Sequence, residues 1–504
     1  MQIKEIETKL WQAADQLRGN MSAEEYMHTI LGILSLKYIS DKFDTAIEKL
    51  KQDGLELSDI EPDELYGEYD AFIVPEKSSW KHIINHANSP QIGQVIDEAL
   101  IAIQNKNKIL KGIFNTNYNN EGIDQNRLGE VVKIFSDEKL NFEKEDIIGR
   151  IYEFFLGKFF KDRGQKGGEF YTPTSIVQLM VSLIKPLNGT IYDPACGSGG
   201  ILIQSKRYIE SHGGDITQVN VYGQEFNQVT WKLAKLNLIL NNFPLTDSDD
   251  NKVLGVKSAD TFTEDQHLNL KFDYVMTNPP FNLKQWNYEK LLDDPRWKYG
   301  IPPKGNANYA WLSHVMSKLS SKGKAAVVLA NGSLSTSQNG EKEIRTELLK
   351  QNKVDMIIGL PSALFYTTGI PASIWIFNNN KTTDKVLMVN ATEIGTMISK
   401  KLRELQTSEI EDITKLYDKH SKGEDINQVG FAKNVSLEEL AENDYSLVPG
   451  RYVGYEEEVV DKEAAKAEIK KISIELKDLF KEFNELMPKV EESIDKAMNF
   501  KEEE

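Results

Sequence analysis

The sequence predicts an α/β protein in which a doubly wound sheet is flanked by a helical N-terminal domain and a helical C-terminal tail. Three observations lead to this fold class. Apolar residues recur at helical spacing through residues 1–165, short β-rich runs alternate with amphipathic runs through residues 166–400, and helical spacing returns over residues 462–504. A chain of 504 residues is also too long for one hydrophobic core, so several domains are expected.

Residues 1–165 are expected to form a mostly helical N-terminal domain. Ser22 and Glu25 have the spacing of a capping box, in which each side chain accepts a hydrogen bond from the other residue's backbone N–H. Apolar residues follow at Ile30, Ile33, Leu34, Leu36 and Ile39. A second helical run is expected from Leu128 to Phe160. Its apolar positions are Val131, Val132, Ile134, Phe135, Ile148, Ile151, Phe154 and Phe155. We interpret both stripes as core packing.

Seven segments between residues 166 and 400 have the composition of strands. They are Thr190–Asp193, Val219–Gln224, Tyr274–Thr277, Ala325–Ala330, Asp355–Leu360, Ser373–Phe377 and Val386–Val389. The amphipathic stretches Ser175–Ile184 and Gln228–Leu240 separate the earlier strands, which is typical of a doubly wound sheet. The last strands follow one another without a helix, and this favours an antiparallel hairpin at one edge of the sheet.

Residues 401–461 are charged and locally irregular, and we expect a connecting region there. The tail, residues 462–504, has an apolar heptad stripe. Its members are Ile469, Ile472, Leu476, Leu479, Phe483, Leu486 and Val490. Pro488 is expected to stop or kink this helix. The stripe predicts packing either on this same chain or on a partner.

The composition excludes several classes of protein. Apolar residues make up 40% and charged residues 27%, as in globular rather than disordered chains. No apolar run reaches the length of about eighteen residues that a membrane span needs. The single cysteine, Cys196, cannot form an internal disulfide, and the 7 histidines lack zinc-ligand spacing. A cytoplasmic protein without a metal site is therefore expected.

The segment Asp193–Gly200, which reads Asp-Pro-Ala-Cys-Gly-Ser-Gly-Gly, follows a predicted strand and opens a predicted helix. Glycines allow a sharp turn and close approach to a ligand, and a helix N-terminus favours a carboxylate or phosphate. Dinucleotide-binding enzymes use such turns, and a turn of this kind can also be purely structural. Asp193 at the strand end, without a later GxGxxG spacing, resembles the cofactor loop of S-adenosylmethionine-dependent methyltransferases.

Two acidic residues downstream are candidates for the same cofactor site. Glu225 follows the next predicted strand, where a carboxylate can accept hydrogen bonds from both hydroxyls of a ribose. Asp260 precedes the strand Tyr274–Thr277 and could contact the cofactor adenine. An acidic residue at a strand end is often merely solvated, so both assignments depend on position.

The segment Asn278-Pro279-Pro280-Phe281 ends a predicted strand. The prolines stiffen the turn and leave the Pro279 carbonyl and the Asn278 side-chain oxygen as adjacent acceptors. Two acceptors match the two N–H bonds of an exocyclic amine. Hydrogen bonds to both of them make the nitrogen lone pair more nucleophilic, most of all in the transition state. Phe281 offers an apolar face to a planar base that has left the duplex.

Together these motifs resemble those of amino-group DNA methyltransferases. A third segment, Gly168-Glu169-Phe170-Tyr171-Thr172-Pro173, precedes the glycine-rich segment and the Asn-Pro-Pro-Phe segment in the chain. This order of the three motifs resembles the modification subunit of type I restriction–modification systems. The resemblance implies a Rossmann-like, seven-stranded methyltransferase domain that transfers a methyl group from S-adenosylmethionine to N6 of adenine in DNA. It assigns these residues to the cofactor site: Glu169, Phe170, Tyr171, Thr172, Pro173, Thr174, Ser198, Gly199, Gly200 and Glu225. Asp193 and Asp260 join them, and Asn278, Pro279, Pro280 and Phe281 form the catalytic set.

The resemblance also implies partners. They are double-stranded DNA with a flipped adenine, a specificity subunit that reads the target and receives the C-terminal helix, a second modification subunit, and a restriction (translocase and nuclease) subunit. The net charge of −17 is unfavourable for binding a polyanion unaided, although a local basic groove is compatible with it. We therefore expect a partner to supply much of the DNA affinity.

The segment from Asn282 to Trp311 interleaves aromatic and basic residues. The aromatic residues are Trp286, Tyr288, Trp297, Tyr299, Tyr309 and Trp311, and the basic ones are Lys284, Lys290, Arg296, Lys298 and Lys304. Such a pattern suits stacking on a distorted nucleic acid strand. It equally suits a long loop whose aromatic side chains fold beneath it.

Two other functions stay open on the sequence. One is a methyltransferase of another planar amide or amine, such as a protein glutamine or a ribosomal guanine. Those families usually have tyrosine in place of Phe281, and they lack the helical domain and tail. The other is a non-catalytic assembly subunit, which the intact motifs argue against and which cofactor binding would test.

Overall fold

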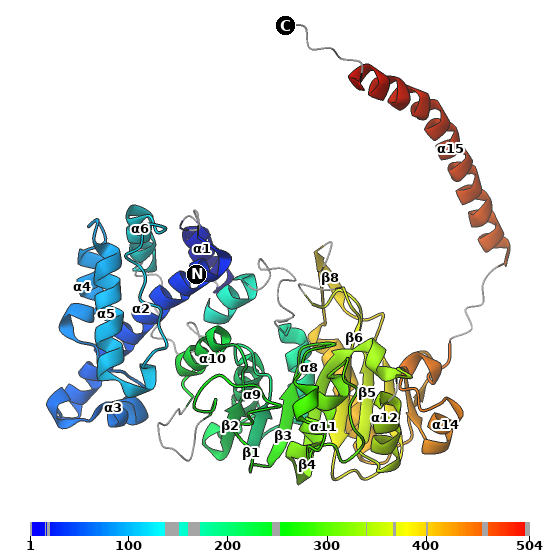
Figure 1. The fold of residues 1–504 in the computed structure, drawn as a ribbon, viewed down its shortest axis with the longest axis horizontal. Coiled ribbons are helices and arrows are strands. Elements are labelled where there is room, and N and C mark those ends of the chain that lie inside the picture. Colours follow the sequence, from blue (N-terminus) through cyan, green and yellow to red (C-terminus); the bar gives the residue numbers. More distant parts are fainter. Residues whose placement is uncertain are drawn as a thin grey trace. The chain divides into compact units, whose positions relative to one another are not determined.

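The computed structural model describes residues 3–15, 17, 21–136, 151–159, 172–243, 253–338, 340–365, 369–399, 402–455 and 462–498 (Figure 1). These residues fall into two compact units, Met1–Val453 and Gly454–Glu504. Glu169, Phe170 and Tyr171 of the predicted cofactor set lie outside the described residues.

The N-terminal part of the first unit is helical, as predicted. Its helices are α1 (Ile3–Asp15), α2 (Ala23–Gln52), α3 (Pro62–Tyr69), α4 (Trp80–Asn85), α5 (Ile92–Lys106) and α6 (Gln125–Phe135). The capping box at the start of α2 is present: Ser22 Oγ accepts the Glu25 N–H at 3.2 Å, and Glu25 Oε2 accepts the Ser22 N–H at 3.0 Å. The apolar residues Ile30, Ile33, Leu34, Leu36 and Ile39 are all buried in the core, which confirms their predicted role.

The predicted helical run from Leu128 to Phe160 was too long. Helix α6 ends at Phe135, where Ser136 is the C-cap and accepts a hydrogen bond from Trp80 Nε1 at 2.8 Å. A separate helical segment spans residues 151–159, and Ile148 lies outside the described residues.

The sheet contains all seven predicted strands. They are β1 (Gly189–Asp193), β2 (Val219–Gly223), β3 (Phe272–Thr277), β4 (Leu319–Ala330), β5 (Val354–Gly359), β6 (Ala372–Asn378) and β7 (Val386–Asn390). Two more strands, β10 (Asn427–Gln428) and β11 (Ala432–Val435), extend it, giving the order β10-β11-β7-β5-β6-β4-β3-β1-β2 over the described residues. The doubly wound sheet is confirmed, and the described residues add two strands to the expected seven.

The antiparallel pairing expected of the last strands is present between β5 and β6, but the expected position at the edge of the sheet was wrong. Strand β6 lies inside the sheet, antiparallel to both β4 and β5, and β7 pairs in parallel with β5. The antiparallel pairs at that edge are instead β11 with β7 and β10 with β11. Consecutive strands without a helix between them can pair with each other or with earlier strands, and both occur here: β6 pairs with β5 and with the earlier β4, whereas β7 pairs with β5 rather than with β6.

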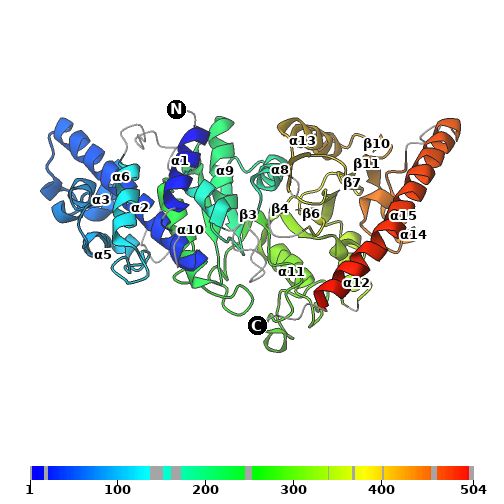
Figure 2. The same cartoon turned by 90° about the horizontal axis from the view of Figure 1, so that it is seen from above.

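Helices cover both faces of the sheet (Figure 2). One face packs against α8 (Thr174–Ile184), α9 (Gly200–Ser211) and α13 (Thr407–Ser421), and the other against α11 (Asn308–Lys318) and α12 (Glu341–Lys350). The alternation of side chains along β4 explains this: Ala326 and Val328 enter the first core, and Val327 and Leu329 enter the second.

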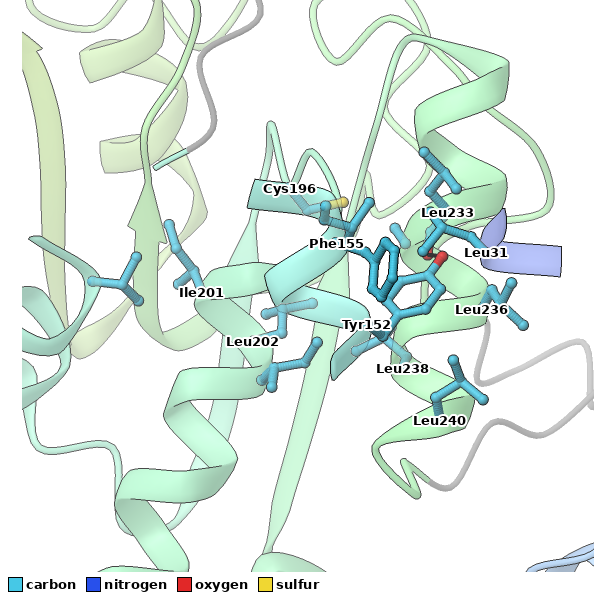
Figure 3. Packing of buried hydrophobic residues seen from close by; sticks show 14 of the residues in the cluster. Leu31, Tyr152, Phe155, Cys196, Ile201, Leu202, Leu233, Leu236, Leu238 and Leu240 are labelled. Atoms are coloured by element: carbon cyan, nitrogen blue, oxygen red, sulfur yellow. Dashed lines mark hydrogen bonds between the residues drawn. The ribbon is translucent and has the colours of Figure 1, made fainter. Parts of the chain in front are cut away.

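The helical N-terminal part shares the first core with the sheet domain. Figure 3 shows Tyr152 and Phe155, from the helical segment 151–159, packed among leucines of α2, α9 and α10 (Gln228–Leu240). The Tyr152 hydroxyl donates to the Leu233 carbonyl at 3.4 Å, and the Tyr38 hydroxyl donates to Asn242 Oδ1 at 3.0 Å. The shared apolar core and these two hydrogen bonds join the helical part to the sheet domain.

The segment after residue 400 is regular, which contradicts the expected irregular connection. Strand β9 (Leu402–Glu404) pairs with β8 (Thr396–Ser399), and α13, β11 and α14 (Leu437–Glu442) follow. Helix α13 is anchored on the buried Asp355 of β5, which accepts the Tyr417 hydroxyl at 2.8 Å and lies 3.1 Å from His420 Nε2. The sheet therefore continues past residue 400.

The second unit is the helix α15 (Lys462–Met498), which begins where the sequence predicts. Pro488 lies inside it, so the helix does not stop there. The seven apolar stripe residues from Ile469 to Val490 are exposed, at 48–67% of their surface. No helix within the described ranges has the length and apolar character needed to cross a membrane.

Candidate active site

The carboxyl ends of β1, β2 and β3 meet at one edge of the sheet. The three strands are parallel neighbours, with Asp193 opposite Gly223 and Tyr192 opposite Val275. Beyond this edge lies a cavity of about 500 Å³. A doubly wound sheet places its ligand sites at the carboxyl ends of its strands, and this volume is ordinary for a small-molecule site.

The glycine-rich turn after β1 forms one wall of the cavity. Gly197 and Gly199 have φ values of 55° and 83°, a backbone conformation that favours glycine. The turn is tied to the end of β2, because the Cys196 N–H donates to the Gln224 carbonyl at 2.9 Å. On its other side, the Ser198 carbonyl accepts a hydrogen bond from Asn237 Nδ2 at 2.8 Å. The start of α9 is therefore fixed beside the cavity.

Glu225 links the turns that follow β1 and β2. One carboxylate oxygen accepts the Gly197 N–H at 3.0 Å, and the other accepts the Asn227 N–H at 2.8 Å. A carboxylate has about four acceptor positions, and Glu225 also lines the cavity.

Asp193 is a buried carboxyl group in the same wall. It is 1% exposed and accepts the Ala195 N–H at 3.0 Å. Burial raises the pKa of Asp193 to about 7, and the nearby Glu225 carboxylate also raises it. A positively charged ligand in the cavity would favour the ionised form of this group.

Asp260 lines the cavity but is also held by its surroundings. One oxygen accepts the Phe262 N–H at 2.8 Å, and the other accepts Asn287 Nδ2 at 2.9 Å. Asn287 belongs to the long segment that follows the Asn-Pro-Pro-Phe turn. Asp260 therefore joins the wall after β2 to the wall after β3.

The Asn278-Pro279-Pro280-Phe281 turn follows β3 and lines the opposite wall. Asn278 Nδ2 donates to Thr172 Oγ1 at 2.9 Å, and Asn278 Oδ1 is buried without a hydrogen-bond partner among the described residues. The Phe281 ring meets the buried Phe365 ring edge-on, with centroids 5.8 Å apart. Among the described residues, the turn therefore presents two features to the same cavity: the Asn278 Oδ1 acceptor, which has no protein donor, and the Phe281 ring, which Phe365 supports.

The structure brings most of the predicted site residues together. The predicted residues that line the cavity are Thr172, Asp193, Ser198, Gly200, Glu225, Asp260, Asn278, Pro279, Pro280 and Phe281. Pro173, Thr174 and Gly199 do not line it: Pro173 and Thr174 begin α8, and Gly199 caps α9.

The aromatic residues after the turn form a small core of their own. Trp286, Trp297 and Trp311 are at most 8% exposed and pack with Phe262, and Tyr309 is fully buried. Of the two alternatives, the loop whose aromatic residues fold beneath it is therefore the one found for Trp286 and Trp297. Tyr309 and Trp311 lie on helix α11, and Tyr309 packs in the second core of the sheet. Arg296 anchors the loop through hydrogen bonds to the Thr261 carbonyl and the Phe262 carbonyl.

Sequence reasoning missed several residues that line the cavity, among them Phe226, Asn227 and Phe262, and it singled out Trp286 and Trp311 for stacking on nucleic acid without placing them at this cavity. Phe226 had a usable signal, because an apolar residue directly after the strand-end Glu225 is out of place in a solvated turn. It is 74% exposed at the cavity. Asn227 and Phe262 line the cavity because of how distant segments pack, and they have no local signal.

A family comparison agrees with this geometry. The model described as N-6 DNA Methylase matches residues 143–461, and the model described as HsdM N-terminal domain matches residues 6–135. The first match covers more than half of the chain. The chain belongs to the N-6 DNA methylase family. In this N-6 DNA methylase the second match covers the helical N-terminal part, and the first covers the sheet and the segment that follows it.

Characterised relatives give the same result. The type I restriction enzyme HindI methylase subunit of Haemophilus influenzae is 39% identical over 419 residues, covering 80% of this chain and 92% of the relative. The MjaIX methylase subunit of Methanocaldococcus jannaschii is 34% identical, covering 98% and 92%. The crystal structure of a type I restriction–modification methyltransferase subunit from Streptococcus thermophilus matches with a TM-score of 0.77 at 28% identity, covering 90% and 100%.

Proposed function

We propose that this N-6 DNA methylase transfers a methyl group from S-adenosylmethionine to N6 of adenine in DNA, as the modification subunit of a type I restriction–modification complex. The observation that supports this most is that one cavity is bordered by both the Glu225 wall and the Asn278 wall. A methyl donor and an amine acceptor can therefore meet in one enclosed space.

The charge of the cavity fits the proposed cofactor. Asp193, Glu225 and Asp260 line it, and they would attract a sulfonium and an ammonium group. They would repel the pyrophosphate of a dinucleotide, the other ligand that a glycine-rich turn suggests. When bound, S-adenosylmethionine supplies an electrophilic methyl group. Glu225 would accept hydrogen bonds from its ribose, and the exposed Phe226 ring offers a face to its adenine.

The Asn-Pro-Pro-Phe turn would hold the target base. Asn278 Oδ1 and the Pro279 carbonyl would accept the two N–H bonds of the amine, which draws the nitrogen lone pair out of conjugation. Phe281, supported by Phe365, would stack on the flipped ring. Pro280 has no backbone N–H, so the Asx-turn hydrogen bond that a residue two positions after Asn278 could donate to Asn278 Oδ1 is absent.

The function is tested by incubating the full chain, with its specificity subunit, with labelled S-adenosylmethionine and DNA, and by identifying the methylated nucleoside by mass spectrometry. N6-methyladenine in DNA is the expected product. Label in protein, in RNA or in another base would show the alternative methyltransferase. A chain that binds no S-adenosylmethionine in calorimetry would be a non-catalytic assembly subunit.

We propose that α15 is the docking element for the specificity subunit. Its stripe residues are exposed from Ile469 to Val490. An exposed apolar stripe of this length is stabilised when a partner helix buries it, which favours a docking role. The net charge of −17 supports delegating DNA recognition to that partner. A second modification subunit and a restriction subunit complete the proposed complex.

A matched pair of variants tests this docking role. Leu479→Asp changes an apolar stripe residue that is 60% exposed, whereas Lys477→Asp changes an exposed charged residue of the same helix. Leu479→Asp should abolish co-purification with the specificity subunit, and Lys477→Asp should leave it intact. Equal assembly of both variants would remove the stripe from the interface.

A further inference from the structure

The turn that presents Asn278 is held by a residue from outside it. Asn278 Nδ2 donates to Thr172 Oγ1 at 2.9 Å, although 106 positions separate the two residues in sequence. Thr172 immediately precedes Pro173 and helix α8, and it lines the same cavity as Asn278. Asn278 is 9% exposed, so its amide has little access to water.

An asparagine amide has two different ends, and only one of them suits an incoming amine. The oxygen can accept an N–H from N6, whereas the NH₂ end would place donor against donor. In this structure the NH₂ end is occupied by Thr172, and the oxygen has no partner among the described residues. The acceptor that the protein leaves unsatisfied is therefore the one that an exocyclic amine would complete.

We propose that Thr172 is a positioning residue that fixes the orientation of the Asn278 amide by accepting a hydrogen bond from Nδ2. This inference deepens the proposed function and rests on it. Without the hydroxyl, the Nδ2 group would be a nearly buried donor without an acceptor. The amide would then rotate or draw in water, and Oδ1 would no longer be aimed at the amine.

A hydroxyl suits this role because it can donate as well as accept. While Thr172 Oγ1 accepts from Asn278, its own hydrogen is directed elsewhere and can be donated to a ligand in the cavity. Serine preserves both properties. Valine has nearly the same shape as threonine but neither property, so the pair of substitutions separates the hydroxyl from the packing of the side chain.

The test compares Thr172→Val, Thr172→Ser and wild type, each as the full chain in complex with its specificity subunit. The methylated adenine is first located in DNA treated with wild-type enzyme. Thr172→Val should then lower kcat by at least about tenfold, and Thr172→Ser should stay within about threefold of wild type. Thr414→Val on α13, whose hydroxyl donates only to the Ile410 carbonyl of its own helix among the described residues, controls for the substitution itself.

A binding probe distinguishes positioning from a general structural effect. Two duplexes are compared in the presence of S-adenosylhomocysteine, which cannot react: one has adenine at the target position, and the other has purine, which lacks the amine. Thr172→Val should weaken binding of the adenine duplex by about tenfold and leave the purine duplex unchanged. The midpoint of thermal unfolding, with Thr172→Ala as a second variant, shows whether the chain is folded.

Three outcomes would overturn the inference while leaving the proposed function intact. They are a wild-type kcat in Thr172→Val, an equal loss of affinity for both duplexes, and a loss confined to affinity for S-adenosylhomocysteine. The last would make Thr172 a cofactor ligand alone. If wild-type enzyme methylates no adenine, the proposed function itself fails, and this result is separate from any difference between the variants.

Discussion

Replacing Glu225 should affect both cofactor affinity and the stability of the site. Its carboxylate accepts the Gly197 N–H at 3.0 Å and the Asn227 N–H at 2.8 Å, so it connects the turn after β1 to the start of α10. Glu225→Ala removes both bonds. Glu225→Gln retains one acceptor oxygen and replaces the other with a donor, so it should retain one of the two bonds.

The magnitude follows from the number and kind of bonds. A hydrogen bond to a charged group contributes about 1.5–3 kcal/mol, and the lower value applies to a half-buried carboxylate that water can partly replace. The free energy of unfolding should therefore fall by about 3 kcal/mol in Glu225→Ala and about 1.5 kcal/mol in Glu225→Gln. Loss of the proposed ribose contacts should weaken S-adenosylmethionine binding about 10- to 150-fold in Glu225→Ala.

Calorimetry measures the affinity, and urea unfolding measures the stability. Asp124→Ala is the matched control, because Asp124 also accepts two backbone N–H groups, from Asn126 at 2.9 Å and Arg127 at 3.1 Å, at the start of α6. Because the Asp124 side chain is 54% exposed and water can replace most of its bonds, its loss should cost only about 1 kcal/mol of stability and should leave cofactor affinity unchanged. Wild-type affinity in Glu225→Ala would place the ribose elsewhere. If Glu225→Ala and Asp124→Ala weakened S-adenosylmethionine binding equally, the effect would come from general destabilisation and not from the loss of ribose contacts.

Three further predictions concern the rest of the site and the tail. Asn278→Ala should retain less than about a tenth of wild-type turnover in a methyl-transfer assay, with S-adenosylmethionine affinity within a few-fold, and higher turnover would contradict its proposed role. Because the folded-state pKa of Asp193 is raised to about 7, its stabilising contribution is fully present below the unfolded pKa of 3.8 and is lost as the pH rises through 7. Asp193→Asn should therefore flatten the decline in unfolding free energy between these pH values. Urea unfolding at several pH values measures this, and the same dependence on pH in the variant as in wild type would refute the assignment. Truncation before Lys462 should abolish the complex and specific DNA binding in gel shifts but leave cofactor binding intact, whereas tight specific binding by the lone full-length chain would refute the delegation of recognition.

Local sequence was enough to predict the elements that local physics determines. The capping box of Ser22 and Glu25 needs only residues three positions apart, and the seven β-rich runs need only their own composition. The placement of Asp193, Glu225 and Asn278 at one edge also followed from sequence, because parallel strands bring their carboxyl ends together.

Pairing between distant segments was not predicted from the sequence. Strands β10 and β11 are short and polar in part, and they are strands because β7 offers an unpaired edge. Helix α13 lies in a charged segment, and the buried network around Asp355 accounts for its attachment to the sheet. Strands β10 and β11 are too short to show a periodicity. Helix α13 does have apolar residues at helical spacing, namely Ile410, Ile413, Leu416 and Tyr417, but the charged composition around them led to an incorrect expectation of irregular chain.

The sequence by itself determined the class of fold, the order of the motifs and the chemistry that the Asn278–Phe281 turn can perform, because these depend on residue type and on spacing along the chain. Tertiary structure decided which partners each site residue has. It buried Trp286 and Trp297 beneath the loop, bound Asp260 to Asn287, and brought Thr172 to the amide of Asn278. These pairings form only when long loops close around a shared cavity. Burial of apolar surface throughout the core offsets the entropy lost on closing the loops, so no single segment of the sequence predicts the pairings.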